Sequence, residues 1–132
     1  LAKFTTALMK AYAGEPNALF SRKTAHDMLA VSWRIKPEEN YGLTGFSYGF
    51  GAFLAGGNDA FCFMHPGTNN PGASSMLIAN PTAGEGAVIM TNGAQGLLFS
   101  NQTVSSIALV YDWSYNGGAQ PEQKPSDRTA DE

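Results

Sequence analysis

The stretch FCFMHPGTNNPGASSMLIANPTAGEGAVIMTN, residues 61–92, contains three short apolar runs separated by residues that form turns. The runs cover residues 60–65, 74–79 and 87–91. The segments between them, 66–72 and 80–86, are rich in Gly, Pro and Asn, which is typical of loops. Strands joined by short connections usually pair antiparallel with their chain neighbours. The stretch therefore predicts an antiparallel meander.

The segment before this stretch predicts one more strand. Aromatic residues alternate with glycines over 41–53, a composition that suits a pleated surface and disfavours a helix. The sequence Gly56-Gly57-Asn58-Asp59 is a strong turn former that would close a hairpin onto residues 60–65.

Helical periodicity flanks the predicted sheet on both sides. Residues 2–12 carry apolar side chains three and four positions apart, and residues 22–30 follow Ser21 as a candidate N-cap. A closing helix is predicted over residues 97–113, with one face formed by Leu97, Val104, Ile107, Ala108 and Tyr111. The expected fold class is α+β: an antiparallel sheet of about four strands flanked by the N-terminal and C-terminal helices, with both packed on one face.

Composition narrows the function. Only 14% of the 132 residues are charged, against roughly 25% in a typical soluble domain. No Lys or Arg lies between Lys36 and Lys124, and the net charge is −3, which argues against nucleic-acid binding. No apolar run is long enough to span a membrane. Residues 1–115 are expected to form one unit, and the polar residues 116–132 a tail.

Metal and disulfide chemistry have little support in the sequence. Cys62 is the single cysteine and lies in an apolar run, which favours a core position. His26 and His65 do not have the spacing of a metal motif. We therefore expect no metal site and no cofactor.

The order of several short motifs resembles the carboxy-terminal part of the serine β-lactamase and penicillin-binding family, especially its class C, D-alanyl-D-alanine carboxypeptidase and esterase branch. His65-Pro66-Gly67 resembles the family's third motif, which is Lys-Thr-Gly or His-x-Gly at the end of a strand. The segments 74–81 and 86–92 resemble the strands that follow that motif. Residues 1–4, 19–29 and 41–46 resemble the elements between the family's second and third motifs, so the likeness runs from Leu1 to about Trp113.

The resemblance implies roles for four residues. His65 would stand where the family has a lysine that orients a substrate carboxylate. Pro66 and Gly67 would lie beside the substrate, with Gly67 allowing close approach to the backbone. The backbone N–H of Thr68 would supply half of an oxyanion hole. Read from the residues alone, His65 is more simply a hydrogen-bonded structural residue, and Thr68 is equally a plain loop residue.

The family's nucleophile motif is missing from these 132 residues. Ser-x-x-Lys, which carries the acylated serine, is absent, and so is Tyr-x-Asn. Ser-x-Asn occurs only as Ser114-Tyr115-Asn116, after the segments that resemble the family. The chain is therefore expected to be a fragment that is inactive alone. Its parent would hydrolyse a β-lactam, peptide or ester, and relatives are usually exported. The missing part of the domain would cover apolar surface, so the isolated chain should self-associate or exchange domains. The alternative is a non-catalytic binding or assembly module.

Overall fold

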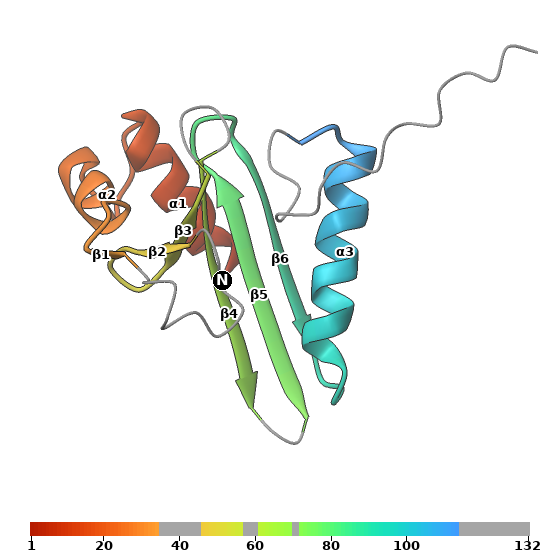
Figure 1. Cartoon of the computed structure of the whole chain (residues 1–132). Coiled ribbons are helices and arrows are strands. Elements are labelled where there is room, and N and C mark those ends of the chain that lie inside the picture. Colours follow the sequence, from red (N-terminus) through yellow and green to blue (C-terminus); the bar gives the residue numbers. More distant parts are fainter. Residues whose placement is uncertain (35–45, 57–60, 70–71, 114–132) are drawn as a thin grey trace, which may run out of the picture.

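The protein is an α+β unit in which a six-stranded antiparallel sheet is combined with three helices (Figure 1). The computed structural model describes residues 1–34, 46–56, 61–69 and 72–113, and the counts refer to these ranges. Strand order follows chain order. The elements are α1 (Ala2–Ala13), α2 (Arg22–Met28), β1 (Trp33–Arg34), β2 (Ser47–Tyr48), β3 (Phe53–Ala55), β4 (Cys62–Asn69), β5 (Ala73–Asn80), β6 (Glu85–Thr91) and α3 (Gly96–Val110).

The expected number of about four strands is too low for two reasons: the predicted strand over 41–53 is divided into β2 and β3, and the sequence did not predict β1. A turn separates β2 from β3, closed by the N–H of Gly49 donating to the carbonyl of Ala52 at 2.9 Å. Gly51 lies in this turn with a φ of 75°, which a residue with a side chain rarely adopts. Residues 41–45 of that prediction, and 57–59 of the predicted turn, lie outside the described residues.

Helices α1 and α2 begin and end where local chemistry allows. The Ser21 hydroxyl accepts from the N–H of Thr24 at 3.0 Å, so the predicted N-cap is confirmed. Gly14 ends α1 in the left-handed conformation, with a φ of 90°.

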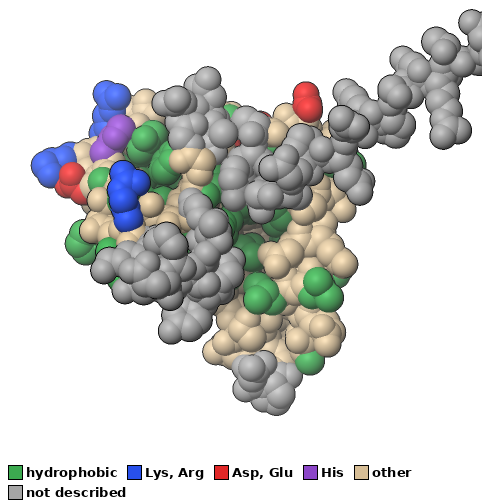
Figure 2. All heavy atoms as spheres, in the orientation of Figure 1, with side chains coloured by type: hydrophobic (Ala, Val, Ile, Leu, Met, Phe, Trp, Pro, Cys, Tyr) green, Lys and Arg blue, Asp and Glu red, His purple; other side chains and the backbone are tan. Residues whose placement is uncertain are grey.

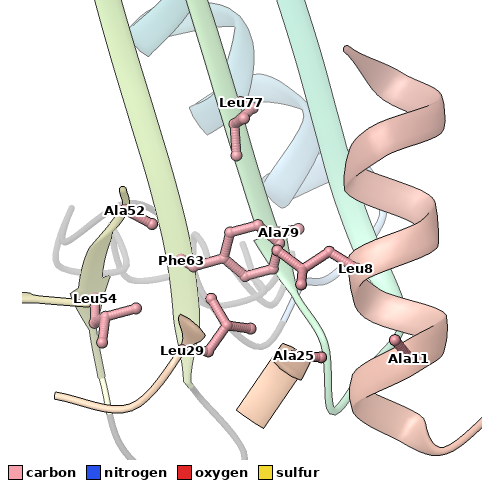
Figure 3. Packing of buried hydrophobic residues seen from close by; sticks show 9 residues of the cluster. All are labelled: Leu8, Ala11, Ala25, Leu29, Ala52, Leu54, Phe63, Leu77 and Ala79. Carbon is pink, nitrogen blue, oxygen red and sulfur yellow. The ribbon is translucent and has the colours of Figure 1, made fainter. Parts of the chain in front are cut away.

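The first and last helices cover opposite faces of the sheet, which corrects the expectation that they share one. Leu77 and Ala79 of β5 pack with Leu8 of α1 in one buried cluster. Met76 and Ile78 pack with Val104 of α3 in the other. Successive strand residues point to opposite faces, so β5 is buried on both sides. Figure 3 shows the first cluster, with Leu8 directed from α1 toward Phe63 and Ala79.

Helix α3 turns small residues toward the sheet. Its buried positions are Gly96, Ser100, Val104 and Ala108, whereas Tyr111 of the predicted face is 72% exposed. The start of α3 lies very close to the end of β6, since a Cβ on Gly96 would be 1.9 Å from the Thr91 Oγ1. The predicted face is right at Val104 and Ala108. Hydrophobic periodicity did not indicate Gly96 and Ser100, because neither is a large apolar residue.

Candidate functional site

The four residues singled out from the sequence lie together in the middle of β4. His65, Pro66, Gly67 and Thr68 pair with Leu77, Met76, Ser75 and Ser74 of β5. The strand was expected to end at His65 and give way to a loop over 66–72. That expectation is wrong, since β4 continues to Asn69.

A proline fits inside β4 because the strand has one open edge there. Among the described residues, β3 pairs with β4 only at residues 62–64, and residues 66–69 pair with β5 alone. Proline within a sheet takes a position whose nitrogen points away from a paired strand. Pro66 thus removes no hydrogen bond from the β4–β5 ladder.

The same geometry sets the direction of the Thr68 N–H. Backbone N–H groups two residues apart in a strand point to the same side. The Thr68 N–H therefore points toward the open edge of β4, as the nitrogen of Pro66 does. An exposed strand edge of this kind offers its N–H and C=O groups to an extended partner.

Side chains of these residues alternate between the two faces of the sheet. His65 and Gly67 face α1, on the side of Phe63, whereas Pro66 and Thr68 face α3. The side chains of His65, Pro66 and Thr68 consequently do not converge on one point. What they share is the backbone edge.

His65 is held by a hydrogen bond to the turn between β2 and β3. Its Nδ1 lies 2.7 Å from the Gly51 carbonyl oxygen, and the ring is exposed. A carbonyl oxygen can only accept, so Nδ1 carries the proton and donates. The sequence did not predict Gly51 as a site residue, because the glycines of 41–53 were interpreted as part of an aromatic strand. The positive φ of Gly51 becomes visible only in the structure.

Gly67 has a packing reason to be glycine. A Cβ at this position would lie 3.0 Å from the Ser75 Oγ on the paired strand, closer than an ordinary contact. The close approach of a substrate to the Gly67 backbone, which the resemblance implies, stays a prediction.

A hollow of about 390 Å³ lies on the other side of the sheet, against α3. Pro66 lines it together with mainly apolar side chains, and Asn101 and Ser105 contribute polar atoms from α3. No sequence pattern indicates this hollow, since it arises from how α3 lies on the sheet.

Charged side chains are concentrated away from residues 65–68. Figure 2 shows Lys and Arg side chains gathered over the α1–α2 end of the molecule. From residue 46 onward, the described residues carry charge only at Glu85 and Asp112. In the same described part of the chain, no group of His, Cys, Asp and Glu could hold a metal ion. Cys62 is buried, as its apolar run predicts.

Among the described residues, no helix combines the length and apolar character that crossing a membrane would need. Comparison of the sequence and structure with family models, curated proteins and solved structures found no match.

Proposed function

We propose that this chain is the carboxy-terminal segment of a serine hydrolase of the β-lactamase and penicillin-binding type. In the parent protein, a serine outside these 132 residues would attack the substrate carbonyl and expel the leaving group. Water would then hydrolyse the acyl-enzyme and regenerate the serine. The chain would contribute the strand that flanks the substrate.

The observation that carries this proposal is that, in the described part of the chain, residues 66–69 of β4 pair with β5 alone and leave the other edge of the strand open. The Thr68 N–H points out of this edge, where it can donate to the oxyanion that forms on the substrate carbonyl. His65 precedes it on the same strand and is fixed by the Gly51 carbonyl. A substrate with an extended backbone can lie along such an edge as an added strand.

The His65→Ala substitution tests this role. In the protein that includes the residues encoded upstream of Leu1, we expect the acylation rate to fall more than about tenfold. Folding should stay nearly unchanged, because the His65 ring is exposed. Stopped-flow acylation and urea unfolding measure the two quantities.

His26→Ala is a matched control. His26 is also exposed, and its Nε2 lies 3.1 Å from a backbone carbonyl oxygen, that of Tyr12. We expect this variant to acylate at the wild-type rate. Unchanged acylation in His65→Ala together with lower stability would make His65 a structural residue.

A second candidate is a non-catalytic assembly module, and the outer surface of α3 favours it. The helix has no charged residue, and Leu98, Phe99, Leu109 and Val110 are more than half exposed. Apolar surface of this kind usually meets a partner. In the proposed parent the rest of the hydrolase domain would cover it. In the isolated chain we expect a second copy to do so, which sedimentation of the purified chain measures.

A further inference from the structure

His65 lies beside a small pocket that contains no charge. The pocket has a volume of about 30 Å³, and its lining includes Phe4 and Leu8 of α1, Met28 of α2, Phe50, and Leu77 of β5. The titratable groups of the two helices that contribute to it are absent from this lining; they are Lys3, Lys10, Tyr12, Arg22, Lys23, His26 and Asp27. Neither the turn at 49–52 nor β5 has a charged residue.

The hydrogen bond to Gly51 determines what His65 can offer to a ligand. A neutral imidazole has one N–H, and at His65 that N–H is the Nδ1 group that donates to the Gly51 carbonyl. Nε2 then carries a lone pair and can only accept. Among the residues that the structure describes, no group bonds Nε2. In its neutral form, His65 therefore presents an acceptor, backed by an apolar pocket.

From this geometry we infer that the site takes substrates that are uncharged where they meet His65 and that donate a hydrogen bond there from an amide or hydroxyl group. The inference rests on the proposed hydrolase function and names its substrate class. A carboxylate in this place would face a lone pair, and the pocket would offer it neither a cation nor a donor. Neutral His65 thus accepts a hydrogen bond from the substrate, whereas a lysine in this position would donate one.

Protonation would reverse the preference without moving the ring. A second proton on the imidazole goes to Nε2, so the bond from Nδ1 to the Gly51 carbonyl remains. The ring then presents a charged donor, which binds a carboxylate through a charge-assisted hydrogen bond. Recognition of an anionic substrate therefore requires the protonated ring.

A pair of thioesters that differ in one group tests the inference. Both carry the same N-acylglycyl group; the thiol that leaves is mercaptoacetate in one and mercaptoacetamide in the other. The protein that includes the residues upstream of Leu1 is assayed for thiol release between pH 5.5 and 8. We expect the amide to have the higher kcat/KM at pH 8, by about tenfold, and this ratio to fall about tenfold by pH 5.5. Ionisations of the shared catalytic groups cancel in the ratio.

Two variants separate substrate selection from a structural role of His65. His65→Gln carries no charge, so its ratio should stay constant with pH. His65→Lys is charged over the whole range and should prefer the carboxylate at every pH. Steady hydrolysis of both thioesters with a ratio that does not change in the wild type would overturn the inference and leave the hydrolase proposal standing. If neither thioester is hydrolysed at any pH, the hydrolase proposal fails, and the inference fails with it.

Discussion

Thr68→Pro should lower the acylation rate of the parent protein by about 100- to 1000-fold, the usual cost of losing one oxyanion-hole donor. Proline has no backbone N–H, and this substitution removes the donor that points out of the open edge of β4. Its effect on the free energy of unfolding should be small, because residue 68 gives no N–H to β5 and proline is tolerated at strand edges. Single-turnover acylation and urea unfolding give the two values.

Two controls make the Thr68→Pro result specific. Thr68→Val keeps the N–H and removes the hydroxyl, so it should acylate near the wild-type rate. Gly67→Pro removes an N–H that points toward β5, where residue 67 is paired with Ser75. This substitution should destabilise the fold by about 3 kcal/mol or more. If Thr68→Pro acylates normally, the Thr68 N–H is not part of an oxyanion hole. If it unfolds as readily as Gly67→Pro, the edge of β4 is not open.

Phe63→Ala should lower the free energy of unfolding by about 3–5 kcal/mol, the usual cost of emptying a large aromatic site in a core. Phe63 is 1% exposed and packs among Leu8, Leu29 and Leu77, where α1 and α2 meet the sheet (Figure 3). The free energy of unfolding of most small domains is only about 5–15 kcal/mol, so this one substitution would remove a large part of it. Urea unfolding followed by fluorescence measures the loss.

Phe50→Ala is the matched control for Phe63→Ala. The Phe50 side chain is 71% exposed, so its removal should change the free energy of unfolding by no more than about 0.5 kcal/mol. Equal effects of the two substitutions would show that the core is not where the structure places it.

The sequence predicted the elements whose boundaries are set by local chemistry. The turn after β5 is one example, since Asn80 Oδ1 accepts from the N–H groups of Thr82 and Ala83 at 2.9 and 3.0 Å. That side chain stabilises the turn within four residues, so the pattern of 80–86 was sufficient to predict it. The N-cap of α2 at Ser21 was predictable for the same reason.

Features that depend on distant parts of the chain were not predictable. The end of β4 was misplaced at Pro66 because a proline usually interrupts a strand, and only the sheet order shows that its nitrogen faces an open edge. The packing side of α3 was predicted only in part. Val104 and Ala108 of the predicted face are buried. Close approach to Thr91 also requires Gly96, which a search for large apolar residues passes over. The bond from His65 to Gly51 joins β4 to the turn between β2 and β3, and the sequence did not predict that turn.

The sequence singled out His65 to Thr68 together, and the structure places them on one strand. Their roles in a site, which the resemblance implies, stay predictions. The resemblance puts a cation or donor at His65. The hydrogen bond to Gly51 occupies the Nδ1–H and leaves Nε2 as an acceptor when the ring is neutral, and no sequence pattern indicates this bond.

The most direct test of the proposed function is to find the acylated serine. The protein, expressed with the residues encoded upstream of Leu1, is incubated with a fluorophosphonate that modifies activated serines, and the modified peptide is located by mass spectrometry. We predict one modified serine, upstream of Leu1 and three residues before a lysine, in the Ser-x-x-Lys pattern. A protein that has no such motif upstream, or whose serines stay unmodified, would contradict the hydrolase proposal and leave the assembly module as the function of this chain.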